Sequence, residues 1–151
     1  MPLLNRSNLQ ALVGQSIGTS SWVEVPQSRI DAFADCTEDR QWIHIDVERA
    51  TRESPFKAPI AHGFLTLSLL PKFYENAFEV VESRMGVNYG LNRVRFMAPV
   101  PVGSRLRGRM KLLSAEPIDG DGLQMVWETT IELEGAAKPA CVAESVVRRY
   151  R

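Results

Sequence analysis

The chain has 151 residues, 44% of them hydrophobic, which favours one globular domain with a sizeable core. Eighteen Lys and Arg residues balance eighteen Asp and Glu residues, so no net charge draws the protein to nucleic acid or to an anionic membrane. No apolar run approaches the roughly 20 residues that span a bilayer, and the first residues lack the pattern of a signal peptide. We therefore expect one cytoplasmic domain over residues 1–151, with no nucleic-acid or membrane partner.

The two cysteines, Cys36 and Cys141, lie far apart and match no spacing of a metal or redox site. Neither has a neighbouring acid–base group that would make it a nucleophile. One long-range disulfide is the alternative to the two unpaired thiols that we expect.

The first third of the chain alternates short predicted elements. Residues 7–13 predict a short helix, and residues 21–25 predict a strand that Pro26 stops. Apolar residues at helical spacing predict a second helix over residues 27–36, capped by Ser28.

Residues 37–46, TEDRQWIHID, break this periodicity and predict an ordered loop. Trp42 and Ile43 are two of its apolar side chains, and burying each stabilises the loop by roughly 1.5–3 kcal/mol. A short helical turn is expected next, over residues 47–53.

Residues 62–78, HGFLTLSLLPKFYENAF, form the most apolar stretch of the chain. They predict a central helix that is buried on nearly all sides. Pro71 should kink this helix or divide it into two.

After Gly86 the apolar period changes to two, which predicts β-strands. The phase slips near Asn92 and Arg93, which indicates a β-bulge or a change of burial. The remaining expected elements are a turn over 99–103, a strand over 106–112, a hairpin turn at 118–122, a strand over 123–133 and a last strand over 140–150. The expected fold class is α+β, with an antiparallel sheet wrapped around the central helix.

The only two histidines fall in the unusual segments. Asp39 and His44 stand five residues apart in the predicted loop, where a carboxylate and an imidazole can hold a water, one removing its proton and the other donating a proton to a substrate. The alternative is that Asp39 caps a turn and His44 is an ordinary loop residue. The Asp46 carboxylate is a second possible partner for His44.

Gly63 follows His62 where the central helix begins. Helix N-termini present unpaired backbone N–H groups, and a glycine lets a thioester carbonyl approach them as its oxygen gains charge. The alternative is that Gly63 only eases helix packing. His62 fits a structural hydrogen-bonding role better than that of a second base.

A metal site is the competing use of these residues. His44 and Asp46 could ligate a metal ion, but no third ligand stands at a recognisable spacing, so we expect no metal. A stripe of basic residues is interpreted as solvated surface, with coenzyme A as its alternative partner: Arg105, Arg107, Arg109 and Lys111.

Three segments resemble the MaoC-like dehydratases of the hotdog superfamily, and especially the NodN-like (R)-specific enoyl-CoA hydratases. They are FADCTEDRQWIHID, PIAHGFLTLSLLP and NYGLNRVRFMAPVPVGSRLR, in that order. The resemblance implies a hotdog fold in a homodimer, and hydration of trans-2-enoyl-CoA to the (R)-3-hydroxyacyl product. It implies no metal or organic cofactor, with coenzyme A entering only as part of the substrate.

The resemblance places the catalytic pair on Asp39 and His44 and the oxyanion-binding amide on Gly63. We expect further substrate contacts from these side chains: His62, Asn92, Arg93 and Arg95. The family commonly has Gly-Asp where this chain has Glu38-Asp39, and Arg40 follows as a cation that would favour the ionised aspartate.

Two other functions remain open. A hotdog acyl-CoA thioesterase would need a carboxylate or polar group on the central helix, where Glu75 is the first carboxylate after Gly63 and Thr66 and Ser68 are the only earlier hydroxyls. A non-catalytic acyl-thioester binding protein would keep the fold without turnover.

Overall fold

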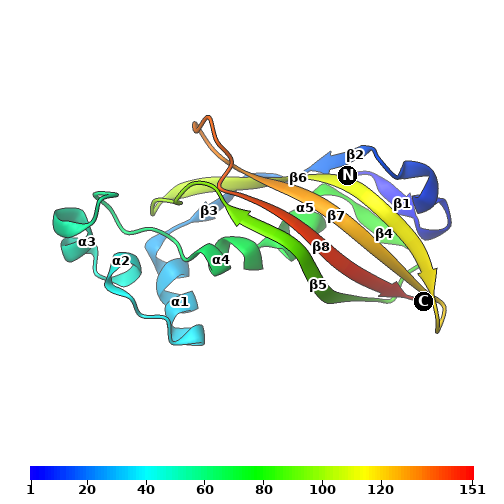
Figure 1. Ribbon diagram of the computed structural model, residues 1–151, viewed down its shortest axis with the longest axis horizontal. Coiled ribbons are helices and arrows are strands. Elements are labelled where there is room, and N and C mark those ends of the chain that lie inside the picture. Colours follow the sequence, from blue (N-terminus) through cyan, green and yellow to red (C-terminus); the bar gives the residue numbers. More distant parts are fainter.

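The computed structural model describes residues 1–151 and shows one long, curved sheet that wraps a pair of short helices (Figure 1). The strand order is β2-β6-β7-β8-β5, all antiparallel, and β3 also pairs with β6. The strands are β2 (Ser16–Thr19), β3 (Val23–Val25), β5 (Met85–Phe96), β6 (Ser104–Ile118), β7 (Gly122–Leu133) and β8 (Cys141–Tyr150). A separate parallel pair joins β1 (Leu3–Asn5) and β4 (Glu79–Val81).

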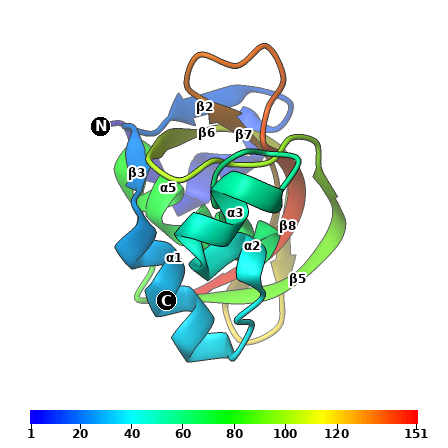
Figure 2. The same cartoon turned by 90° about the vertical axis from the view of Figure 1, so that its left-hand side faces the viewer.

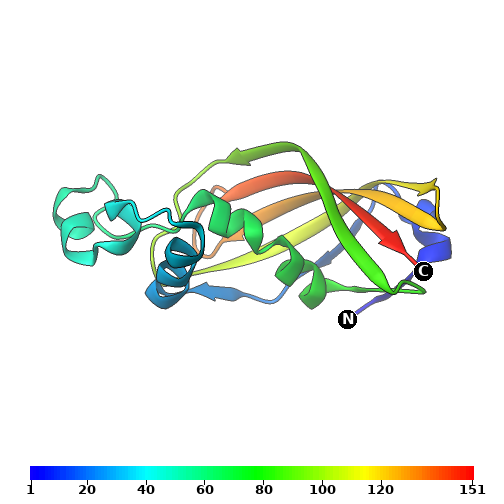
Figure 3. The ribbon, with the colours of Figure 1, turned by 90° about the horizontal axis from the view of Figure 1, so that it is seen from below.

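The helices form two groups. α4 (Gly63–Ser68) and α5 (Leu70–Ala77) run along the inner face of the sheet (Figure 3). Three others stand beyond one end of the sheet, where Figure 2 shows them together: α1 (Gln27–Thr37), α2 (Trp42–Ile45) and α3 (Val47–Glu53). This layout confirms the expected α+β hotdog arrangement. None of the helices combines the length and the apolar composition that a membrane-spanning helix requires.

The central helix is divided at Leu69, and Pro71 lies in the first turn of α5. This confirms the expected effect of that proline, since its ring and missing N–H are tolerated only in a first turn. Phe73 of α5 is fully buried against the sheet, where a Cβ at Gly108 would come within 2.8 Å of the Phe73 Cβ. Gly108 therefore lets the helix approach closely.

The prediction of a helix buried on nearly all sides is wrong. Phe64 is 68% exposed, and Leu67 and Leu69 are only partly buried. The physical reason is that the sheet covers one side of α4 and α5, while no second layer of this chain covers the other (Figure 3).

The strand pattern agrees closely with the expected one. The hairpin forms between β6 and β7 with Gly120 and Asp121 at positive φ, and the apolar face of β7 is buried. The register of β5 against β8 shifts between Leu91 and Arg93, which confirms the bulge. Both cysteines are free, as expected.

The N-terminal elements differ in detail. The first expected helix is a 3₁₀-helix, η1 (Arg6–Leu12), and the strand expected over 21–25 is only β3. Ser28 is not a cap, because Pro26 occupies the N-cap position of α1 and no side chain caps it. The short strands β1, β2 and β4 were not expected, because a strand of three or four residues is too short to show an alternating apolar pattern.

Candidate active site

Asp39 lies between α1 and α2, after a left-handed turn. Glu38 ends α1 with a φ of 64°, a conformation that L-residues with a side chain rarely adopt. Asp39 directly follows this turn, and its Oδ1 accepts a long hydrogen bond from the Gln41 amide at 3.4 Å. The Asp39 carboxylate is otherwise exposed to solvent.

His44 is the most buried residue of α2, with only 6% of its surface exposed. Its Nδ1 lies 2.6 Å from the carbonyl oxygen of Ile60, and a carbonyl only accepts, so Nδ1 carries the proton. The Ile60 amide in turn donates to the Ile43 carbonyl at 3.0 Å. In the neutral ring this leaves a lone pair on Nε2, which is the form that a general base requires.

His62 packs against one face of the His44 ring and supports its position. The two imidazoles stack with centroids 3.8 Å apart, and Phe33 packs on His62 at 4.9 Å. The His62 Nε2 donates to the backbone carbonyl of Asp39 at 2.9 Å. His62 therefore joins the loop that carries Asp39 to the helix that begins at Gly63.

The surroundings of His44 hold its ring neutral. Desolvation by burial is the largest cause that lowers the pKa of His44, and the adjacent His62 lowers it further. The hydrogen bond to Ile60 and the charge of Asp39 act in the opposite direction without reversing the shift.

Asp46 is not the partner of His44. Its Oδ1 accepts a hydrogen bond from the Arg49 amide at 2.9 Å, which makes it the N-cap of α3. Arg40 does not pair with Asp39 either, because its guanidinium lies 3.6 Å from the carboxylate of Asp35. The fold therefore leaves Asp39 as the carboxylate nearest to His44.

One possible metal-ligand atom from each of Asp39, His44 and His62 lies within 4.8 Å of the others. His62 is thus the third possible metal ligand, which the spacing of residues in the sequence did not indicate. The donor set fits a metal poorly, because a zinc ion needs lone pairs that converge at about 2.0–2.1 Å. Two stacked rings present their in-plane lone pairs side by side rather than converging.

Gly63 is the first residue of α4, where backbone amides have no partner within the helix. A Cβ at Gly63 would lie 3.2 Å from the ring of Phe96, so the packing role considered for this glycine is real. A cavity of about 370 Å³ opens beside it, lined by Gly63, Phe56, Ala61 and Phe96 among others. The amide and its approach path are thus compatible with a bound carbonyl.

The other expected substrate contacts lie apart from this cluster, on the edge strand β5. Asn92 donates to the Glu144 carboxylate at 2.8 Å, and Arg95 donates to the carbonyl of Val94. Arg93 is exposed. No hydrogen bond joins these three side chains to Asp39 or His44, so a substrate contact from them would involve a more distant part of the ligand.

The three arginines of the basic stripe on β6 pair with glutamates that lie on β7 and directly after its last residue. Arg105 pairs with Glu134, while Arg107 and Arg109 pair with Glu132 at 2.6 and 3.4 Å. This supports the interpretation of the stripe as solvated surface.

Several groups that shape the site carried no local signal in the sequence. Gln27 donates to the backbone carbonyl of His44 at 2.8 Å, and Ile60 and Phe33 make the contacts described above. Each lies at least 16 residues from its partner in the sequence, so no short motif contains the pair.

Comparison with known proteins agrees with this geometry. The MaoC-like domain model matches residues 8–134. The 3-hydroxyacyl-thioester dehydratase Z of Mycobacterium tuberculosis is 49% identical over 142 residues, covering 94% of this chain and 93% of that protein. Nodulation protein N of Rhizobium leguminosarum bv. viciae is 46% identical over 141 residues, covering 93% of this chain and 88% of that protein.

Solved structures share the fold. The (R)-hydratase from A. caviae involved in PHA biosynthesis aligns with a TM-score of 0.69 at 24% identity, over 89% of this chain and 94% of that one. The sequence match extends over most of the chain, and the structural match over nearly the same share. The chain therefore belongs to the MaoC-like domain family, a family of hydro-lyases.

Proposed function

We propose that the protein is an (R)-specific enoyl-CoA hydratase, which reversibly adds water to trans-2-enoyl-CoA and forms (R)-3-hydroxyacyl-CoA. The observation that carries this proposal is the buried His44 ring, protonated on Nδ1 by its bond to Ile60 and placed beside the Asp39 carboxylate. The reverse reaction, dehydration of a 3-hydroxyacyl thioester, uses the same groups and agrees with the name of the 49% identical relative, 3-hydroxyacyl-thioester dehydratase Z.

In the proposed reaction, Asp39 and the Nε2 of His44 hold one water between them. The water oxygen bonds to C3 of the enoyl group, and the pair removes one water proton. Because His44 is neutral and Asp39 is the carboxylate beside it, the site starts without a spare proton. The same proton therefore passes on to C2, and the pair returns to its starting state.

The Gly63 amide is proposed to stabilise the thioester oxygen, which gains negative charge as C3 is attacked. A donor of this kind is typically worth about 10²–10³ in rate. The reaction has no redox step and no leaving group besides water, so the proposal needs no organic cofactor and no metal.

The protein is also proposed to act as a homodimer that pairs along β5. All but one of the residues of this 12-residue edge strand are exposed, and it carries a row of apolar side chains, including Val87 at 41%, Tyr89 at 59% and Leu91 at 47% exposure. An unpaired edge of this length with apolar side chains is a surface that another chain covers.

Sedimentation velocity tests the dimer. We expect Leu91→Lys to shift the protein from two copies to one. Val47→Lys changes an equally apolar residue, 51% exposed on α3, and should leave the sedimentation coefficient unchanged. A monomeric wild-type protein would contradict the proposed dimer.

Incubation with crotonyl-CoA tests the reaction. We expect loss of the enoyl-thioester ultraviolet absorbance, no release of free thiol, and a product oxidised only by an (R)-specific 3-hydroxyacyl-CoA dehydrogenase. Release of thiol from saturated acyl-CoA would indicate the thioesterase instead. Binding without turnover at several chain lengths and pH values would indicate the non-catalytic protein.

The structure does not favour a thioesterase that uses a carboxylate of the central helix. Glu75, the first carboxylate after Gly63, is exposed and pairs with Lys72 at 3.3 Å. It lies 12 residues along the helices from Gly63, which is roughly 18 Å at the helical rise, too far to serve a thioester at that amide.

A further inference from the structure

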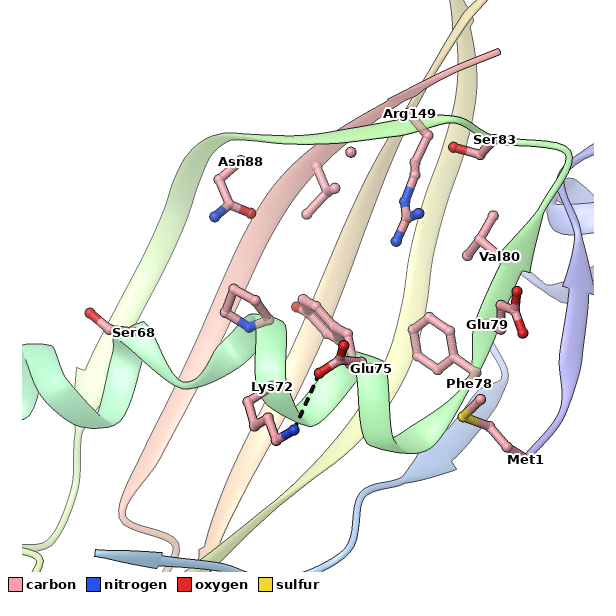
Figure 4. A pocket seen from close by; sticks show the side chains of 14 residues that line it. Met1, Ser68, Lys72, Glu75, Phe78, Glu79, Val80, Ser83, Asn88 and Arg149 are labelled. Atoms are coloured by element: carbon pink, nitrogen blue, oxygen red, sulfur yellow. Dashed lines mark hydrogen bonds and ion pairs between the residues drawn. The ribbon is translucent and has the colours of Figure 1, made fainter. Parts of the chain in front are cut away.

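A second cavity, of about 870 Å³, opens at the end of α5 that is remote from Gly63, between this helix and the strands β4, β5 and β8 (Figure 4). Part of its wall is apolar: Pro71, Phe78, Val80 and Val147. Figure 4 shows the side chain of Arg149 extending from β8 into this space. A cavity of this size with an apolar wall and one inward cation is large enough for part of an amphipathic ligand.

Arg149 is half-buried, and the part of its guanidinium that is buried has no hydrogen-bond partner. Its Nε is buried without a hydrogen-bond acceptor, and burial lowers the pKa of the group. Its neighbour Arg148 differs, since that Nε donates to Gln124 at 2.9 Å and the guanidinium lies 3.4 Å from the ring centre of Tyr89. A buried donor without an acceptor costs free energy, and a charged donor costs more.

The backbone makes room for Arg149 where it stands. A Cβ at Gly86 would come within 3.1 Å of its Nε and 3.3 Å of its Cζ, so the guanidinium lies against the glycine. The other charges of the cavity leave Arg149 available: Lys72 pairs with Glu75, and Glu79 is exposed to solvent.

This cavity continues into a smaller one of about 380 Å³, and the two share Ser68, Pro71, Tyr74 and Asn88 in their walls. The smaller cavity is lined by Leu67 and Leu91 among others. Leu67 follows Gly63 by four residues, one helical turn, and so lies on the same face of the helix. From Gly63 to Tyr74 is roughly 16 Å at the helical rise per residue.

We propose that Arg149 binds a carboxylate at the far end of the substrate's acyl chain, so that the enzyme accepts 2-enoyl thioesters that carry an ω-carboxylate. The chain would run from the thioester at Gly63 past Leu67 and Tyr74, and its terminal carboxylate would pair with the part of the Arg149 guanidinium that faces the cavity. A guanidinium and a carboxylate match in geometry as a bidentate pair. This inference rests on the proposed hydratase function and adds its substrate class.

Kinetics with paired substrates test the inference. The two trans-2-enoyl-CoA substrates have equal chain length, long enough to reach Arg149, and end in a methyl group or in a carboxylate. We expect Arg149→Met to lower the ratio of kcat/KM for the carboxylate over the methyl substrate by about tenfold or more, which is the usual size of a hydrogen bond to a charged group. Arg148→Met is the matched control and should leave this ratio unchanged.

Gly86→Ala provides a second variant that keeps the charge. Its added methyl group displaces the guanidinium, so the ratio should fall here as well, even if Arg149→Met folds poorly. A wild-type ratio that neither variant lowers would overturn the inference. Crotonyl-CoA hydration by the wild type would still stand in that case, so the two failures are distinguishable.

Calorimetry on Asp39→Asn gives a readout that needs no turnover. A saturated ω-carboxyacyl-CoA should bind more tightly than the methyl-ended acyl-CoA of equal length, and Arg149→Met should abolish the difference. A free fatty acid that binds equally well and depends on Arg149 would show that the carboxylate belongs to a separate ligand, which overturns its assignment to the substrate.

Discussion

The imidazole rings of His44 and His62 stack at 3.8 Å between centroids, with 24° between their planes. His44, whose ring carries the proposed chemistry, therefore packs on His62. His62 in turn donates a hydrogen bond to the backbone carbonyl of Asp39, the catalytic partner of His44. The proposed acid–base pair is therefore joined by a third residue, and that residue directly precedes Gly63. One small cluster links all the groups of the proposed reaction.

Replacing His62 tests this linkage. In His62→Ala the Asp39 carbonyl loses its donor and the face of His44 loses its support, so kcat should fall by up to about 10²-fold, the usual cost of a misplaced reacting group. His62→Gln can still donate and should retain more activity. Because His62 lowers the pKa of His44, the acid limb of the rate profile should also move to higher pH in His62→Gln. An unchanged pH profile would indicate a purely structural role.

Replacing either member of the pair should remove the chemistry without unfolding the protein. Asp39→Asn and His44→Ala are each expected to lower the hydration rate by at least about 10²–10⁴, the range of general acid–base contributions. Asp46→Asn is the matched control, since asparagine is also a good N-cap and the α3 helix should persist. Near wild-type activity in either pair variant, with normal circular dichroism, would refute the mechanism.

Much of the fold could be predicted because its signals are local and periodic. The apolar face of β7 and the hairpin before it follow from residues adjacent in sequence, as does the division of the central helix at Leu69, just before Pro71. The exposure of Phe64 could not, because it depends on what covers the outer side of α4, and the apolarity of a segment does not say which of its faces is buried.

The site could be predicted only in part for the same reason. Asp39, His44 and Gly63 fall in segments whose order resembles a known family, but the carbonyl that fixes the His44 tautomer belongs to Ile60, 16 residues away. The choice between Asp39 and Asp46 depended on a helix cap that only the fold reveals. The lack of a partner for the buried Nε of Arg149 could not be predicted either. The sequence of β8 does not show which of the adjacent residues Arg148 and Arg149 has a partner.

The pH dependence follows from the lowered pKa of His44. The folded state favours the neutral ring, so its contribution to stability is complete above the unfolded value of 6.5 and is lost as pH falls through the folded pKa. The acid limb of kcat/KM should accordingly lie below pH 6.5. In Asp39→Asn the charge that opposes this shift is gone, so the pKa should fall further. NMR titration resolves this, since the chain has only two histidines; a higher pKa in Asp39→Asn would contradict it.

Gly63→Ala should lower activity through a defined contact. The added Cβ would stand 3.2 Å from the Phe96 ring, so the ring or the helix start must shift, and with it the amide proposed to bind the thioester oxygen. We expect kcat to fall by about 10²-fold or less. Phe96→Leu in the same chain relieves the contact and should restore part of the rate. A double variant no better than Gly63→Ala would show that the contact is not the cause.

The last prediction concerns the turn that places Asp39. Glu38 has a φ of 64°, which costs a residue with a side chain about 1–2 kcal/mol, and glycine avoids this cost while losing about 0.5–1 kcal/mol of unfolded-state entropy. Glu38→Gly should therefore stabilise the fold by about 0.5–1 kcal/mol in urea unfolding. Glu38→Ala keeps the strained backbone and should not stabilise, so equal gains from both would rule out the backbone explanation. Lys57→Gly, at a φ of 58° on another turn, should give a similar gain with unchanged activity. If Glu38→Gly stabilises the chain but slows hydration, the stiffer glutamate turn is what holds Asp39 beside His44.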